Sequence, residues 1–102
     1  MTASLGVWAA GPVAGGTLYR WEADRGEGGN GFVVFDDQAQ TIRPSDAEGT
    51  PRGTFVVDVA AAESAGATEG VSPSLVLKVA AAIVKAYRRA GKIPETAHAY
   101  FS

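Results

Sequence analysis

The chain has 102 residues, of which 46% are hydrophobic and 20% charged, and its formal net charge is −2. This size and balance predict a single globular domain over residues 1–102, and they exclude an acidic disordered tail and a highly basic nucleic-acid-binding peptide. The sequence has no cysteine and one histidine. It therefore cannot build a disulfide scaffold, a thiol enzyme or a metal centre made of cysteines or several histidines.

The sequence also predicts where the protein resides. Its first fifteen residues carry no Lys or Arg, unlike a secretory signal. The longest apolar run, residues 79–84, is far shorter than the ~18–20 residues that span a bilayer. We therefore expect a cytoplasmic protein with no membrane partner.

Turn residues divide residues 17–59 into four predicted strands, which follow an apolar N-terminal segment over residues 1–16. The strands are residues 17–22, 32–35, 40–43 and 54–59. Tyr19 and Trp21 share one face of the first strand, and Pro44 is expected to end the third because it cannot donate to a central ladder. The connections are short, which predicts an antiparallel meander.

A helix is predicted over residues 72–91. Ser72 suits the N-cap and Pro73 the first helical position. Apolar residues then recur with the 3.6-residue period of a core-facing stripe, and Gly91 supplies the stop.

The remaining segments are predicted to carry little structure. Residues 60–71 are expected to form a surface connection, and the tail, residues 92–102, to add one helical turn with Tyr100 and Phe101 as packing anchors. The predicted fold class is α+β: a four-stranded antiparallel β-meander followed by one long C-terminal helix packed on one sheet face, in the order β-β-β-β-α.

The strand at residues 32–35 is apolar on both faces, whereas a single helix covers only one face of a sheet. We expect the second face to be covered either by residues 1–16 or by another copy of the chain. Because symmetric dimers are the commonest oligomers, the sequence predicts a homodimer.

Charge is distributed unevenly along the chain. Residues 1–72 hold four arginines against ten acidic residues, a net charge of −6, whereas residues 73–102 hold five basic residues against Glu95, a net charge of +4. The basic residues predicted to form one helix stripe that binds a partner are Lys78, Lys85, Arg88 and Lys92. A solvated face beside the helix C-terminus explains such a stripe, and a docking face for an acidic protein partner is the alternative. Trp8 is the aromatic residue best placed for an exposed contact.

No catalytic, cofactor-binding or metal-binding residues are predicted. Residues 26–33 match the glycine spacing of nucleotide-binding loops, but a strand follows where a dinucleotide site needs a helix, and the chain is too short for a kinase. The carboxylates that cluster at Asp36-Asp37 and at Asp46 and Glu48 suit side-chain bonds within turns. His98 has no evident acid partner.

We therefore expect a non-enzymatic protein-binding module without a cofactor. A small-molecule-binding domain and a single-stranded nucleic-acid-binding domain are the alternatives. The element order is similar to the repeat unit of the Whirly and PUR single-strand-binding proteins, and the composition is similar to that of small immunity and antitoxin proteins. The predicted sheet carries no ladder of Lys or Arg, which argues against nucleic acid.

Overall fold

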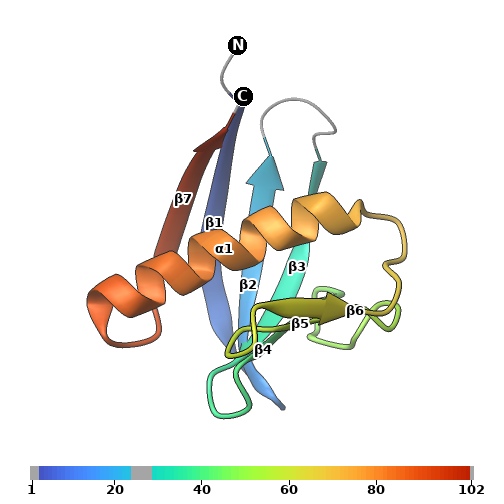
Figure 1. Cartoon of the computed structure of the whole chain (residues 1–102), viewed down its shortest axis with the longest axis horizontal. Helices are drawn as coiled ribbons and strands as arrows, with labels where there is room; N and C mark the ends of the chain where they lie inside the picture. The colour runs from blue at the N-terminus through green and yellow to red at the C-terminus, as the bar shows by residue number, and fades with distance from the viewer. Residues whose placement is uncertain (1–2, 24–28, 102) are drawn as a thin grey trace.

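The computed structural model describes residues 3–23 and 29–101, which form a seven-stranded antiparallel sheet with one helix across one face (Figure 1). The strands are β1 Ala3–Val13, β2 Gly16–Ala23, β3 Gly29–Asp36, β4 Thr41–Ser45, β5 Val56–Asp58, β6 Glu63–Ala65 and β7 Thr96–Phe101. Their order across the sheet is β6-β5-β4-β3-β2-β1-β7, so β1 to β6 form a meander and the last strand returns beside the first. The α+β class is confirmed, but the sheet has more strands than the predicted four.

The helix α1 (Pro73–Ala90) has nearly the predicted bounds. Ser72 is extended at the N-cap position, but its side chain makes no capping hydrogen bond. Gly91 takes the left-handed conformation, with φ 73°, and its N–H donates to the Tyr87 carbonyl. Glycine adopts this conformation without a Cβ penalty, so it ends the helix.

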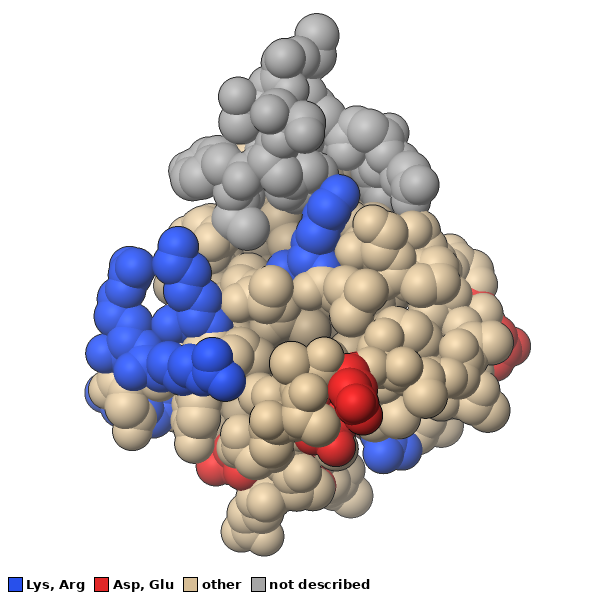
Figure 2. Space-filling view, in the orientation of Figure 1, with Lys and Arg blue, Asp and Glu red and all other residues tan. Residues whose placement is uncertain are grey.

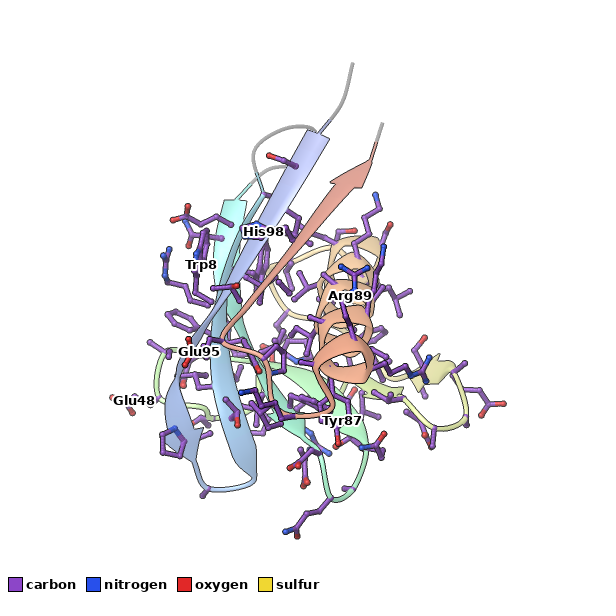
Figure 3. All side chains as sticks on the ribbon, turned by 90° about the vertical axis from the view of Figure 1, so that its left-hand side faces the viewer. Trp8, Glu48, Tyr87, Arg89, Glu95 and His98 are labelled. Atoms are coloured by element: carbon purple, nitrogen blue, oxygen red, sulfur yellow. The ribbon has the colours of Figure 1, made fainter. Side chains whose placement is uncertain are left out.

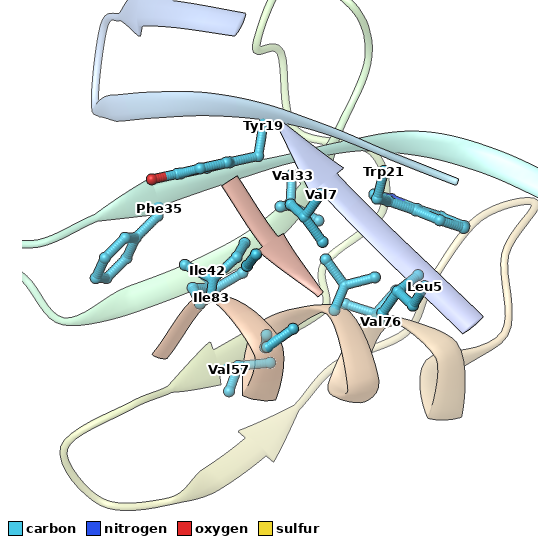
Figure 4. Close-up of a cluster of buried hydrophobic side chains, with 14 of the residues drawn as sticks. Leu5, Val7, Tyr19, Trp21, Val33, Phe35, Ile42, Val57, Val76 and Ile83 are labelled. Atoms are coloured by element: carbon cyan, nitrogen blue, oxygen red, sulfur yellow. The ribbon is translucent and has the colours of Figure 1, made fainter. Parts of the chain in front are cut away.

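The core lies between α1 and the sheet face that it crosses (Figure 4). Val76 and Ile83 of the helix are fully buried, as are Tyr19 and Val33 of the sheet. Trp21, on the same face of β2 as Tyr19, is 2% exposed. The predicted faces of the helix and of β2 are therefore confirmed.

Residues 1–16 were predicted to be a segment outside the sheet, and this is wrong for the part that is described. Residues 3–13 form β1, which pairs with β2 on one side and β7 on the other. Leu5 and Val7 of β1 are 1% and 0% exposed and belong to the core under α1, so they do not cover the second face.

The tail was predicted to be helical, and this is also wrong. Residues 96–101 form β7, whose backbone pairs with β1 from Ala3↔Phe101 to Trp8↔Thr96. Threonine and aromatic residues favour extended backbone, and β1 offers this segment a free edge to pair with. The packing role predicted for Tyr100 and Phe101 concerns side chains outside the described part of the structure.

Three further predictions need correction. The strand predicted over residues 54–59 is limited to β5, Val56–Asp58. The surface connection 60–71 contains β6, an exposed three-residue strand held by its backbone pairing with β5. Pro44 lies inside β4, opposite Val33, and does not end the strand. The Pro44 carbonyl accepts a hydrogen bond of 3.0 Å from the Arg52 N–H, so the backbone of Pro44 faces residues 51–52 and its missing N–H breaks no bond to β3 or β5.

The second sheet face is already partly covered within one chain. Leu18 and Val34 lie on it, opposite the core residues of β2 and β3, yet each is only 6% exposed. The loop between β4 and β5 lies against the last residue of β1, since a Cβ built on Gly49 would be 3.1 Å from the Val13 Cβ. These apolar side chains therefore do not require a second copy of the chain, and the homodimer stays a prediction that sedimentation tests.

Candidate functional site

Basic side chains gather over the C-terminal end of α1, as Figure 2 shows. Of the four residues predicted to form one stripe, Lys85 and Lys92 line a groove beside β7. Arg88 lies on the other flank of the helix and lines a separate groove against β5 and β6. Lys78 is exposed nearer the start of the helix. The structure therefore divides the predicted stripe between two flanks.

The sequence analysis missed Arg89, which lines the groove together with Lys85 and Lys92. The helical period could have identified it. At 3.6 residues per turn, Arg89 lies about 20° around the helix from Lys78, whereas Arg88 lies about 80° away. The i, i+4 spacing from Lys85 to Arg89 is the signal that places both on one flank.

The groove runs between the C-terminal half of α1 and residues 92–98, and its volume is about 650 Å³. Figure 3 faces this side of the molecule. On the helix the lining includes Ala82, Ala86 and Ala90, which recur every four residues and leave the space beside β7 open. In Figure 1 the C-terminal end of α1 extends beyond β7, past the edge of the sheet. The helix thus overhangs a space that a further strand would occupy.

The strand below this overhang is β7, which lies at one end of the sheet. In the described residues β7 pairs with β1 and stands at the end of the sheet order. The Ala9 N–H donates to the Glu95 carbonyl at 2.8 Å. In antiparallel pairing the bonded positions alternate, so Ala97 and Ala99 also face β1. The backbone N–H and C=O groups of Thr96, His98 and Tyr100 therefore point away from β1, toward the open edge.

Positive charge predominates in the groove. Lys85, Arg89 and Lys92 line it together with one carboxylate, Glu95. None of the three basic side chains has an ion-pair or hydrogen-bond partner within the described part of the chain. The groove therefore presents an excess of uncompensated positive charge beside an unpaired strand edge.

Trp8, the predicted aromatic contact, lies on the sheet face away from α1 and is half-buried. Its indole leans over Gly6, since a Cβ built there would lie 2.6 Å from the ring. The Arg20 guanidinium lies 4.6 Å from the ring centroid, and an ion pair of 2.6 Å to Glu22 holds that arginine. His98 meets the indole edge-on, with 6.4 Å between ring centroids. Much of the indole is thus occupied by contacts within the chain.

The acidic turn residues behave as the sequence predicts. The Asp46 carboxylate accepts backbone N–H bonds from Glu48 at 2.8 Å and Thr50 at 3.0 Å. These bonds, Thr50's first, lower the pKa of Asp46. The Asp36 carboxylate accepts bonds from the Gln38 and Ala39 N–H groups in the same way. The prediction of turn-capping carboxylates is therefore confirmed for Asp36 and Asp46.

Comparison with protein-family models, curated proteins and solved structures finds no match. Within the described residues, no cluster of His, Cys, Asp or Glu side chains has the composition to hold a metal ion. In that same part of the chain, no helix combines the length and apolarity that crossing a membrane requires.

Proposed function

We propose that this protein is a binding module that takes an extended segment of a partner protein as an additional strand beside β7. The observation that carries the proposal is the unpaired edge of β7 beneath the overhanging end of α1. An exposed edge presents a row of unpaired N–H and C=O groups, and recognition by strand addition uses such a row.

The two edges of the sheet differ in a way that supports this proposal. Proteins protect edges from unwanted pairing by making them short, by charging them or by placing proline in them. The β6 edge has three residues, which makes it short. The β7 edge has six residues and contains neither a proline nor a charged side chain. Of the two, β7 is the edge that is left able to pair.

The groove supplies the second half of the binding surface. A strand added beside β7 would have one face toward Ala82, Ala86 and Ala90 of α1, whose small side chains leave space for it. The backbone of the added strand would bond to the outward N–H and C=O groups of Thr96, His98 and Tyr100. Main-chain hydrogen bonds then give affinity, and the side chains in the groove give specificity.

Proline substitution at the edge tests the proposal. His98→Pro removes one outward N–H and leaves the bonds to β1 in place, because Ala97 and Ala99 make those bonds. His98→Ala is the matched control, since it removes the imidazole and keeps the N–H. The probes are three decapeptides in which threonine alternates with a second residue: (Thr-Glu)5, (Thr-Gln)5 and (Thr-Lys)5. Each is titrated into the protein at millimolar concentration, and binding is followed through the backbone amide signals of the protein.

We expect at least one peptide to bind, and His98→Pro to weaken it at least tenfold, or about 1.4 kcal/mol. His98→Ala should change its affinity by less than about twofold, since a side-chain loss alone leaves the main-chain bonds intact. Either of two results would contradict strand addition at β7: no binding by any of the three peptides, or binding that both variants leave unchanged.

A further inference from the structure

The charge of the groove indicates what kind of segment would lie beside β7. Three cationic side chains and one carboxylate line it, so its net charge is positive although the whole chain has a net charge of −2. A cluster of like charges repels itself, and these three have no partner among the described residues. A ligand with several carboxylates would relieve that repulsion, whereas a basic segment would increase it.

The helix macrodipole accounts for only part of this cluster. Cations are stabilised near the last turn of a helix, where the carbonyl groups are unpaired. The basic residues in the last turn of α1 are Arg88 and Arg89. Lys85 precedes that turn and Lys92 follows the helix, yet both line the same groove. The dipole favours Arg88 equally, and Arg88 faces the other flank. The gathering of three cations beside β7 thus exceeds what the dipole requires.

A second copy of the chain fits this edge poorly. Two β7 strands paired antiparallel about a twofold axis would place both helices on the same face of a continuous sheet. Each overhanging helix end would then compete for the space above the other copy's β7. The pairing would also bring two sets of Lys85, Arg89 and Lys92 together, and like charges across an interface are destabilising.

We infer that the partner segment is an acidic extended peptide, whose carboxylates pair with Lys85, Arg89 and Lys92 while its backbone pairs with β7. This inference rests on the proposed function, and it names the chemical class of the partner. The three cations select the partner by charge, and the strand edge holds it irrespective of sequence.

The same three peptides test the inference through their relative affinities. At low salt (Thr-Glu)5 should bind at least tenfold more tightly than (Thr-Gln)5, which corresponds to about 1.4 kcal/mol. (Thr-Lys)5 should bind most weakly. In about 1 M salt, where the Debye length falls to about 3 Å, the advantage of glutamate over glutamine should largely disappear.

Charge variants identify the residues responsible. Lys85→Gln combined with Arg89→Gln should reduce the preference for (Thr-Glu)5 over (Thr-Gln)5 several-fold. Arg88→Gln is the matched control, because it removes one cation from the neighbouring position on the opposite flank. It should leave the preference unchanged.

The outcomes separate the inference from the proposed function. Equal binding of the glutamate and glutamine peptides, still weakened by His98→Pro, would overturn the acidic partner and retain strand addition. A preference for glutamate that Arg88→Gln abolishes as strongly as the groove variants would overturn the assignment to this groove. Protection of the β7 edge amides that rises with protein concentration in the absence of peptide would show that a second copy occupies the edge instead.

Discussion

Replacing Tyr19 by phenylalanine tests how the edge strand is held in place. The Tyr19 hydroxyl donates a buried hydrogen bond of 2.6 Å to the Pro94 carbonyl, across 75 residues of sequence. Pro94 lies in the segment that joins α1 to β7 and lines the groove. The bond therefore ties β2, an inner strand of the sheet, to the segment that leads into β7.

The expected loss follows from the burial of this bond. Tyr19→Phe removes the donor and leaves the Pro94 carbonyl without it, while the ring keeps its packing at a position that is 0% exposed. A typical buried hydrogen bond contributes about 0.5–1.5 kcal/mol, and a carbonyl left unsatisfied costs about 1–3 kcal/mol. We therefore expect the variant to lose about 1–2 kcal/mol in its free energy of unfolding at neutral pH.

The pH dependence provides an independent check. Burial, with a smaller contribution from the charge of Asp37, raises the pKa of Tyr19 from 10.0 to about 12. A group whose pKa is raised by folding contributes stability that is complete below its unfolded pKa and is lost as pH rises through the folded value. The advantage of the wild type over Tyr19→Phe should thus be constant below pH 10 and fall between pH 10 and about 12. Two pKa units set an upper limit of about 2.7 kcal/mol on that fall.

The assay is urea denaturation of both proteins over this pH range. Lysines also titrate there, but they do so in both proteins, and their effect cancels in the difference. Equal stability at neutral pH would refute the argument that the bond is buried. A difference that stays constant through pH 12 would refute the raised pKa.

Two other predictions concern the glycines beneath the tryptophans and the turn at Asp46. A Cβ on Gly31 would lie 2.9 Å from the buried Trp21 ring, so Gly31→Ala should cost about 1–3 kcal/mol by overpacking, as measured by thermal or urea unfolding. Gly6→Ala is the matched comparison. It should lower the free energy of unfolding by less, because the half-buried Trp8 ring can turn toward solvent, and the tryptophan fluorescence should shift. A larger loss of stability than for Gly31→Ala would contradict the burial assigned to the two rings. The wild type should be more stable than Asp46→Ala above pH 3.8, the unperturbed pKa of the carboxyl. This difference in stability should vanish as the pH falls through the lowered pKa of the folded protein. A difference that does not depend on pH would show that the carboxylate does not cap the turn.

The parts of the fold that local chemistry determines could be predicted from the sequence. Pro73 and Gly91 bound α1 because the fixed φ of proline and the left-handed backbone of glycine are local requirements, whereas the Ser72 side chain makes no capping hydrogen bond. The shared face of Tyr19 and Trp21 follows from strand alternation alone. Such features depend on a few consecutive residues, so one sequence is enough to reveal them.

The outer strands could not be predicted in this way. The pairing of Leu5 with Ala99 joins residues from opposite ends of the chain, and no local pattern encodes a partner so distant in sequence. Glycine and proline interrupt residues 1–16, so their sequence resembles an irregular segment. In the structure, however, Leu5 lies in the core and is 1% exposed. Burial in the assembled fold overrides weak local strand propensity here.

In the candidate site, too, the local features could be predicted from the sequence and the long-range ones could not. Helical spacing places Lys85 and Arg89 on one flank of α1, whereas Lys92 lies beyond the end of the helix and no helical period places it in the groove. The strand edge beside them depends on the order of strands in the sheet, which the sequence does not display. The sequence predicts a basic stripe on the helix as a partner-binding surface, and the proposed function adds the edge of β7 as a second component of that surface.

The central claim is that a partner strand pairs with the outer edge of β7. It is tested most directly by intermolecular nuclear Overhauser effects between the labelled protein and unlabelled (Thr-Glu)5. The proposal predicts contacts from the backbone amides of Thr96 and His98 to the peptide backbone, because adjacent strands lie only about 4.8 Å apart. Contacts confined to Trp8 and Arg20 on the opposite sheet face, or to α1 without β7, would contradict it.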